Sequence, residues 1–302
     1  MSDLNQIIKR RKREDFIFNL VGIACLLVGI FTLLALLIDL VVDGLPRIDW
    51  QFLTSFPSRF ASQAGILSAW VGTLLIMLVT ASTAVPLGIA AGVYLEEYAP
   101  KNRLTNIIEV NIANLAGVPS IIYGLMALGL LVYQFRLGQS ILTGGLTLAF
   151  LILPIVIVAT REALRTIPLH IRDAAYALGS TKWQVVRHHL LPYSVGGTMT
   201  GVIIALSRAI GETAPLITIG ALTFIAFLPP PPIGAEPPFL FFDWVWSPFS
   251  ALPIQMFNWV SRPESDFLLN AAGAGLLLIA VTLSMNAVAI MIRYRVRKRI
   301  KW

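Results

Sequence analysis

The sequence predicts an all-α membrane protein with six transmembrane helices, and three observations lead to this prediction. The 302 residues are 57% hydrophobic and only 13% charged, whereas soluble domains are about half apolar and about a quarter charged. Several charge-free runs are as long as the roughly 20 residues that a helix needs to cross a bilayer. Lys and Arg gather in alternate connections between these runs, which is typical of loops held on one side of a membrane.

A basic segment at residues 1–15 precedes the first apolar run. A secretory signal peptide also begins in this way, but its apolar core spans only about 7–15 residues. The run that begins at Phe16 is longer and reaches Asp39 before the next charge. Residues 16–42 are therefore predicted to form the first transmembrane helix, and residues 43–65 an extracytoplasmic loop.

Residues 66–293 are predicted to form a core domain that contains the other five spans. The segments that predict these spans lie at residues 61–95, 110–135, 137–160, 192–227 and 267–292. Pro86 predicts a kink in the first of them. Four consecutive prolines at residues 229–232 cannot continue a helix. The fifth span is therefore expected to stop near Phe227, and an extracytoplasmic loop to cover about 228–266.

The basic residues predict the orientation of the six spans. Of the 23 Lys and Arg residues, 18 lie in the N-terminal segment, in the connections after the second and fourth spans, and around the tail at residues 294–302. Both termini are therefore expected in the cytoplasm. The net charge of +7 follows from this asymmetry and does not indicate nucleic-acid binding. The single cysteine, Cys25, lies in the first apolar run and excludes a disulfide framework within the chain.

Residues 170–192, between the fourth and fifth spans, predict two short helices with a sharp bend. The alanine-rich first half favours helix, and Gly179 supplies the left-handed residue on which helices commonly end. Thr181 and Gln184 have the spacing of a capping box for a second helix. Pro192 is expected to end that helix where the fifth span begins.

The acidic and small residues of this segment have a recognisable spacing. Asp173-Ala174-Ala175 is followed by Gly179 and then by His189-Leu190-Leu191-Pro192. This spacing resembles the cytoplasmic loop signature of binding-protein-dependent ABC importer permeases, with Asp173 where glutamate is usual and His189 where isoleucine is usual. Three further stretches, Gly117–Gly124, Ser207–Leu216 and Phe257–Pro263, are similar to the PstA-type phosphate permeases. The resemblance extends from about Ile66 to the C-terminus.

This resemblance implies a type I, MetI-like transmembrane domain that forms half of the translocation path of an ATP-driven phosphate importer in the bacterial plasma membrane. The chain would be a permease and not an enzyme, with ATP and Mg bound by partner subunits and no cofactor of its own. The implied partners are a second permease of PstC type, two ATP-binding subunits of PstB type, an extracytoplasmic phosphate-binding protein of PstS type and membrane lipid. Two alternatives are a permease for another oxyanion, such as sulfate or molybdate, and an ion-coupled secondary anion transporter.

The residues expected to contact the ATP-binding subunit share the first helix of the bent segment and its end. They are Asp173, Ala174, Ala175, Tyr176, Leu178 and Gly179. Small side chains let a helix enter a groove on a partner closely, while larger ones anchor it. The simpler interpretation of this segment is a solvated amphipathic loop.

Charged residues in the fifth span predict contacts with the transported anion. A guanidinium within a membrane span is costly and normally faces protein or water, and its planar fork matches phosphate oxygens. Arg208 is therefore expected in the substrate path, together with Glu212 and with Thr213 beside the kink at Pro215. The alternative is that Arg208 and Glu212, four residues apart, only pair with each other.

Ser120 and Tyr123 in the third span are further candidates for the path, although polar residues of membrane helices more often hydrogen-bond to other helices. Arg161 and Glu162, at the cytoplasmic end of the fourth span, are expected to form either a solvated pair or a relay at an inner gate. The aromatic stretch at 239–246 fits an interfacial belt and equally a docking surface for the binding protein. No phosphate-loop motif and no metal-ligand or nucleophile spacing occurs, so no catalytic or metal site is expected.

Overall fold

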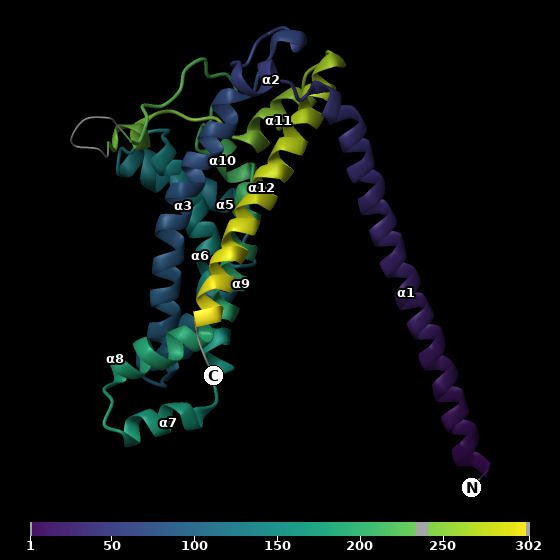
Figure 1. Ribbon diagram of the computed structural model, residues 1–302, viewed down its shortest axis with the longest axis vertical. Helices are drawn as coiled ribbons and strands as arrows, with labels where there is room; N and C mark the ends of the chain where they lie inside the picture. The colour runs from purple at the N-terminus through teal and green to yellow at the C-terminus, as the bar shows by residue number, and fades with distance from the viewer. Residues whose placement is uncertain (1, 234–240, 300–302) are drawn as a thin grey trace.

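The computed structural model describes residues 2–233 and 241–299, and the regular structure of these residues is helical. Long helices lie side by side in a bundle, while the first helix, α1, stands apart from it (Figure 1). The long helices are α1 (Ser2–Gly44), α3 (Leu67–Val93), α6 (Ile141–Arg165), α9 (Leu191–Ile210) and α12 (Asp266–Arg299). The shorter α-helices are α2 (Trp50–Thr54), α4 (Arg103–Leu115), α5 (Ser120–Ala127), α7 (Leu169–Ala177), α8 (Lys182–Val185), α10 (Ala214–Thr218) and α11 (Leu252–Val260).

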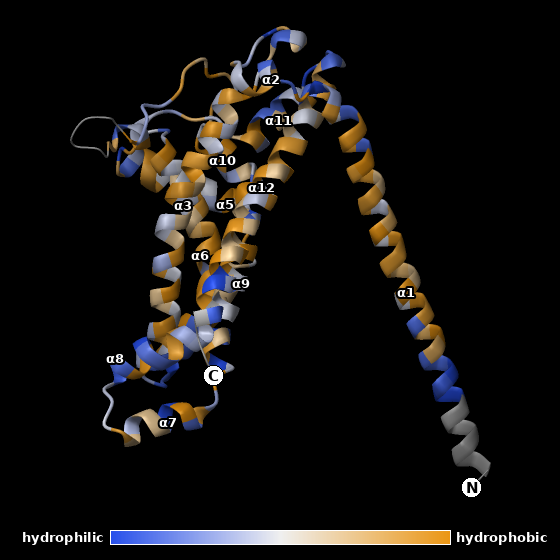
Figure 2. Cartoon of the chain, viewed as in Figure 1, coloured by the Kyte–Doolittle hydropathy of each residue, from blue (hydrophilic) through white to orange (hydrophobic). Residues whose placement is uncertain are grey.

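The bundle has two distinct ends, which are named here the α2 end and the α7 end (Figure 1). π-helical turns extend three of the helices: η3 (Tyr94–Tyr98) follows α3, η4 (Leu128–Gln134) follows α5 and η5 (Val186–Leu190) follows α8. The 3-10 turns are η1 (Leu45–Arg47), η2 (Ala61–Gln63) and η6 (Asp243–Trp246). Most of α1 and the middle of the bundle are hydrophobic, whereas polar residues gather at both ends (Figure 2).

The prediction of six membrane spans is confirmed, with one span in two pieces. Within the described chain, five helical segments are long and apolar enough to cross a bilayer, and a bent pair can form a sixth span. The five segments are Arg10–Arg47, Leu67–Tyr98, Ile141–Arg165, Lys182–Ile210 and Asp266–Val296. The bent pair is Arg103–Leu115 with Ser120–Gln134.

The third span is broken, so the expectation of one helix through residues 110–135 was wrong. α4 and the Ser120–Gln134 segment meet at an angle of 104°. The break falls at Gly117-Val118-Pro119. Proline lacks the N–H that would continue the helix and disfavours helical geometry in the residue before it, so α4 ends and α5 starts afresh.

The fifth span ends earlier than the sequence suggested. α9 stops at Ile210 rather than near Phe227, and the five-residue α10 follows after a break at Gly211–Thr213. Pro215 has no N–H to donate within the interior of a helix, so α9 does not continue through it. It lies in the first turn of α10, where its missing N–H costs little. The break places irregular backbone inside the bundle.

The bend at Gly179 and the capping box are confirmed. Gly179 has a φ of +82°, and the Thr181 side chain and the Gln184 side chain cap the start of α8 reciprocally. Pro192 does not end the second helix, because the helical segment runs from Lys182 through η5 into α9 as far as Ile210. Proline fits there because it directly follows the π-helical turn η5, where the regular hydrogen-bond pattern of the helix is already altered.

Close contacts between backbones hold α3, α6 and α9 together. α3 and α6 form the most extensive helix pair, and α6 and α9 the next. A Cβ atom added at Gly92 of α3 would collide with Thr160 of α6. One added at Gly201 of α9 would collide with Ala159 of α6. These three helices therefore form one tightly packed frame, named here the α3–α6–α9 frame.

α1 touches the bundle only near the α2 end. Gly44 lies so close to α12 that an added Cβ would meet Ala272 and Leu276. The rest of the helix points away from the bundle, and its membrane-length window has no buried residue (Figure 1). The apolar side chains of α1 are therefore exposed in the isolated chain.

We expect Gly124→Val to loosen the contact between α5 and α10. A Cβ atom at position 124 would collide with Pro215 and the Thr218 side chain, and such overpacking typically costs about 1–3 kcal/mol. The measurement is the Tm of the purified, detergent-solubilised complex. Gly129→Val is the matched control, because a Cβ at position 129 meets nothing within 4 Å; equal losses in both variants would contradict the prediction.

Candidate functional site

The two helix breaks lie next to each other inside the bundle. One break separates α4 from α5 at residues 116–119, and the other separates α9 from α10 at residues 211–213. α5 and α10 are in direct contact, and Gly124 of α5 allows the close approach of Pro215. The candidate path residues therefore lie at two neighbouring helix breaks. Ser120 and Tyr123 lie just after the first break, and Arg208, Glu212 and Thr213 lie at the second.

Arg208 lies in the last turn of α9, directly before the second break. Its Nε donates to Oε1 of Glu212 at 3.3 Å, so the predicted pair is present. The Arg208 side chain is 41% exposed and that of Glu212 is 18% exposed. Within the described part of the chain, the four N–H groups on Nη1 and Nη2 form no hydrogen bond. The pair thus leaves the outer edge of the guanidinium open to an anion.

Tyr123 bridges the first break and stands near the charge of Arg208. Its hydroxyl donates to the carbonyl oxygen of Leu115, the last residue of α4, at 2.9 Å. Arg208 lies within electrostatic range of this phenol. Ser120 opens α5 and is half-buried. Tyr123 therefore links α5 to α4 by a hydrogen bond and also lies near Arg208, the candidate contact for an anion.

Thr213 starts α10. Its carbonyl oxygen accepts hydrogen bonds from the backbone N–H groups of Leu216 and Ile217, both at 3.1 Å. Its side chain is half-buried. The five predicted path residues thus gather at the two breaks, although no hydrogen bond joins Thr213 or Ser120 to Arg208 in the described chain.

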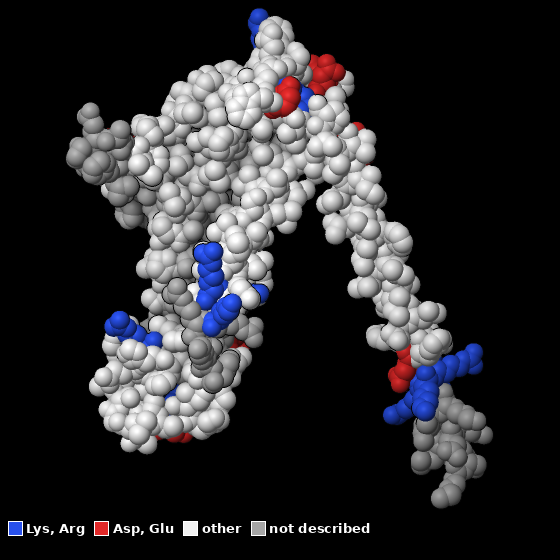
Figure 3. Space-filling model, in the orientation of Figure 1, with Lys and Arg blue, Asp and Glu red and all other residues white. Residues whose placement is uncertain are grey.

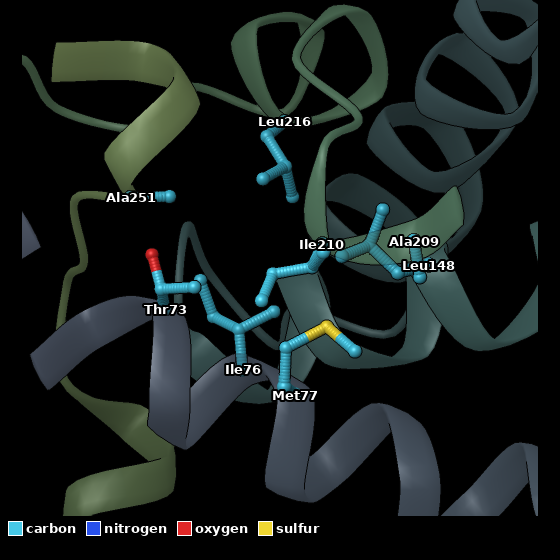
Figure 4. Close-up of a pocket in the computed structure, with 8 residues that line it drawn as sticks. All are labelled: Thr73, Ile76, Met77, Leu148, Ala209, Ile210, Leu216 and Ala251. Carbon is cyan, nitrogen blue, oxygen red and sulfur yellow. The ribbon is translucent and has the colours of Figure 1, made fainter. Parts of the chain in front are cut away.

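A small void in the core beside the second break is not an anion site (Figure 4). Its free volume is about 10 Å³, which is about the minimum for one water molecule. The lining side chains are Thr73, Ile76, Met77, Leu148, Ala209, Ile210, Leu216 and Ala251. The Thr73 hydroxyl already accepts from Leu252 N–H and donates to the Ala69 carbonyl. The void offers an anion neither space nor donors.

An apolar hollow of about 350 Å³ lies on the α7 side of Arg208. It is lined by Ala113, Ala116, Pro154, Ile155, Val158, Ala159, Gly201 and Ile204, from α4, α6 and α9. Ile204 lies one turn before Arg208 on the same exposed stripe of α9. An anion that left Arg208 along this stripe would cross apolar surface before it reached the α7 end.

Arg161 is buried at the α7 end among acidic side chains, which corrects the expectation of a solvated pair with Glu162. Its side chain is only 7% exposed. Nη2 lies 2.6 Å from Oε1 of Glu109 on α4, and Nε lies 3.5 Å from Oε2 of Glu96 in η3. These contacts are short ion pairs without the geometry of directional hydrogen bonds. Glu162 instead pairs with Arg165 at 3.2 Å.

Arg165 and Arg172 extend this cluster. Arg165 donates from Nε to Glu96 at 2.9 Å, and Arg172 of α7 donates to Glu97. Sequence reasoning missed the acidic residues of this network, Glu96, Glu97 and Glu109, because they were assigned to a solvated turn or to the edge of a span. The available signal was the position of Glu109, a single acid directly before a long charge-free run.

The first helix of the bent segment presents one face to solvent. Leu178 is 88% exposed and Tyr176 is 42% exposed, and Asp173, Ala174 and Gly179 are also exposed. Ala175 departs from its expected role, because it is buried in a cluster with Val185 and Leu190 and faces the bundle. The exposed members of the predicted contact set are thus free to meet another protein.

The charges of the described residues are unevenly distributed (Figure 3). Lys and Arg mark the start of α1 and the half of the bundle near α7, with acidic atoms among them, while acidic and basic atoms both appear at the α2 end. Of the aromatic stretch at 239–246, residues 239 and 240 lie outside the described residues; Trp244 is buried while Phe242 and Trp246 are exposed. No group of His, Cys, Asp or Glu in the described ranges could hold a metal ion.

Comparison with known proteins connects this geometry to a family. Residues 84–302 match the family described as "Binding-protein-dependent transport system inner membrane component". The chain is 32% identical over 302 residues to the phosphate transport system permease protein PstA of Xylella fastidiosa, covering 98% of this chain and 99% of that protein. It is 31% identical to PstA of Yersinia pestis, covering 92% and 90%. A probable ABC transporter permease, YqgI of Bacillus subtilis, is 29% identical and covers 88% of each.

Solved structures agree with the fold. A bacterial alginate ABC transporter chain has a TM-score of 0.66 at 13% identity, covering 95% of this chain and 96% of that one. A chain of the inward-facing MetNI methionine ABC transporter has a TM-score of 0.58 at 18% identity, covering 74% and 93%. The architecture is therefore that of ABC importer transmembrane domains of type I.

We expect Glu109→Gln to destabilise the α7 end, because it leaves the buried Arg161 guanidinium without its nearest counter-charge. The loss is about 1–3 kcal/mol and is measured as a lower Tm of the purified complex. Glu162→Gln removes the same charge from a carboxylate that is 63% exposed, and is expected to cost less than about 0.5 kcal/mol. A Tm unchanged by Glu109→Gln would refute the structural role of the cluster.

Proposed function

The chain belongs to the binding-protein-dependent transport system inner membrane components, and from this premise we propose that it is the PstA-type permease subunit of an ATP-driven phosphate importer. The proposal rests on similarity to phosphate transport permeases over the whole chain. It also rests on the exposed Arg208 guanidinium at a helix break, of which only Nε is paired, with Glu212. A membrane-spanning permease of this family works with an ATPase and a binding protein.

Arg208 is proposed as the contact for phosphate. Guanidinium matches phosphate oxygens with two parallel hydrogen bonds, and the Nη edge of Arg208 is available for them. Glu212 holds Nε and keeps the site from binding too tightly, since a permeation site must also release its ion. Thr213, Ser120 and Tyr123 complete the path at the adjoining breaks. One arginine leaves a phosphate dianion incompletely neutralised, so the second permease is expected to supply another basic residue.

The breaks themselves favour a wet path. Backbone groups that leave a helix at membrane depth are tolerated where protein buries them or where they line a water-filled cavity. Both breaks occur beside Arg208, which itself needs water or a counter-charge. We therefore place the translocation path along the exposed stripe of α9, closed on its other side by a partner permease of PstC type.

The exposed face of α7 is proposed to receive an ATP-binding subunit of PstB type. Leu178 and Tyr176 serve as anchors, and Asp173, Ala174 and Gly179 permit close approach. ATP and Mg are held by that subunit, and the chain itself acts as a permease without a cofactor. A PstS-type protein delivers phosphate at the α2 end. The basic residues near the α7 end support a cytoplasmic location for both termini, with the chain in the bacterial inner membrane.

Arg208→Gln is expected to lower phosphate uptake by at least about tenfold, since a charged bidentate contact worth roughly 1.5–3 kcal/mol is lost. The assay is uptake into vesicles that contain the complete importer, with complex assembly checked by size-exclusion chromatography. Arg11→Gln, which removes the same charge at the start of α1, is the control. Uptake at the level of the unmodified complex in assembled Arg208→Gln would exclude Arg208 from the path, and sulfate uptake in place of phosphate would identify a different oxyanion.

Gly179→Val is expected to separate ATP hydrolysis from transport. Position 179 has a φ of +82°, which a β-branched residue adopts only with strain, so the bend between α7 and α8 would shift. Gly179→Asn tolerates this conformation and should retain coupling, because no neighbouring atom lies within 4 Å of an added Cβ. The measured quantity is phosphate taken up per ATP hydrolysed; indistinguishable ratios for Val and Asn would argue against a role for the bend.

A further inference from the structure

We propose that Arg172 is a positioning residue that transmits the motion of α7 to the α3–α6–α9 frame through its ion pair with Glu97. The inference rests on the proposed function, because it concerns how force reaches the path. The Arg172–Glu97 ion pair is a physical connection between α7 and the helix bundle, and it involves neither the other residues of the loop motif nor the path residues. In this proposal α7 is the element that a docked subunit displaces, and the α3–α6–α9 frame is the part that carries Arg208.

Arg172 binds three segments at once. Its Nε and Nη2 donate to Oε1 of Glu97 in η3 at 3.2 and 2.8 Å. Its Nη1 donates to the Ile167 carbonyl at 2.9 Å, and Nη2 also donates to the Leu164 carbonyl at 3.1 Å. Leu164 lies in the last turn of α6, where helix carbonyls lack partners within the helix. One side chain thus joins α7 to the ends of both α3 and α6.

This joint is largely shielded from solvent. The Arg172 side chain is 12% exposed and the Glu97 side chain is 7% exposed, and both line an open hollow of about 490 Å³ at the α7 end. A shielded charge pair with good geometry resists separation, because parting it breaks several charge-assisted hydrogen bonds at once. Arginine suits the position because its rigid fork serves a carboxylate and two carbonyls together, which a lysine could not do.

The C-terminal end of α7 is free. Leu178, directly after α7, is 88% exposed, so a subunit docked on it would pull on α7 without touching the joint. Tyr176 is 42% exposed but lines the same hollow as Arg172 and Glu97. On the bundle side, the apolar contacts of α7 are few: Ala175 is its buried residue, and Ile171 is partly buried. Arg172 is therefore the strongest polar attachment of α7 to the helices above it.

The frame continues this connection towards Arg208. Directly above the joint, Gly92 of α3 packs against Thr160 of α6, and Gly197 of α9 packs against Ala163 of α6. Contacts this close do not allow the helices to slide independently. A displacement of α7 that is held at Arg172 would thus move α3 and α6 together, and α9 with them.

The experiment compares Glu97→Gln, Arg172→Met and the double variant in vesicles that contain the complete importer, with its ATPase, partner permease and binding protein. Phosphate uptake per ATP hydrolysed is measured alongside assembly and Tm. If the pair carries the motion, each variant lowers this ratio by about fivefold or more, as for an ordinary allosteric coupling. The double variant should show no further loss, because both single changes remove the same interaction.

Arg187→Met is the matched control, since it removes an exposed arginine from the same connection and should leave the ratio unchanged. The double variant leaves no buried charge unpaired, so it keeps the test decisive even where Arg172→Met fails to assemble. A purely structural role would lower Tm and yield of the complex but leave the ratio intact, and that result overturns the proposal. Absence of phosphate uptake by the unmodified importer would instead contradict the proposed function.

Discussion

The interior of a bilayer offers no hydrogen bonds to a peptide group or to a charged side chain, and this constraint explains where the chain is irregular. Both interruptions of the membrane helices fall beside each other, at residues 116–119 and 211–213. Arg208 stands at the second of them, where Glu212 pairs with its Nε. Such features are stable only where protein or water covers them, and this requirement supports the proposal that the surface of α9 at Arg208 faces another subunit or an aqueous path.

The regular part of the molecule has the opposite character. Glycines on α3 and α9 bring their backbones against α6, and tightly packed interiors transmit displacement instead of absorbing it. Ionic contacts are concentrated at the α7 end, where Arg161, Arg165 and Arg172 meet Glu96, Glu97 and Glu109. The α3–α6–α9 frame is rigid, the ionic cluster lies at its α7 end, and the two helix breaks lie near Arg208. This arrangement suits a transporter that opens and closes a path at Arg208.

Sequence reasoning succeeded where local chemistry decides the structure. The bend at Gly179, the capping box of Thr181 and Gln184, and the number of spans follow from short-range rules, and all three are present. Sequence reasoning failed for features that depend on packing between segments far apart in the sequence. Pro215 was expected to kink the fifth span and Pro119 was not expected to interrupt the third, but whether a proline kinks or breaks a span depends on neighbouring helices. The partners of Arg161 lie 52 and 65 residues away in sequence, a distance that no periodicity encodes, and the placement of Ala175 depends on the same long-range packing.

The attachment of α1 has a consequence for biosynthesis. Its docking surface lies on α12, around Ala272 and Leu276, more than 200 residues later in the chain. Arg47 binds the nearby carbonyl oxygens of Ala61, Ser62 and Ala64, and its Nε also donates to Asn270 of α12. α1 can therefore dock only after the intervening helices have been synthesised. A chain truncated before α12 would lack this docking surface and would leave α1 without its partner helix.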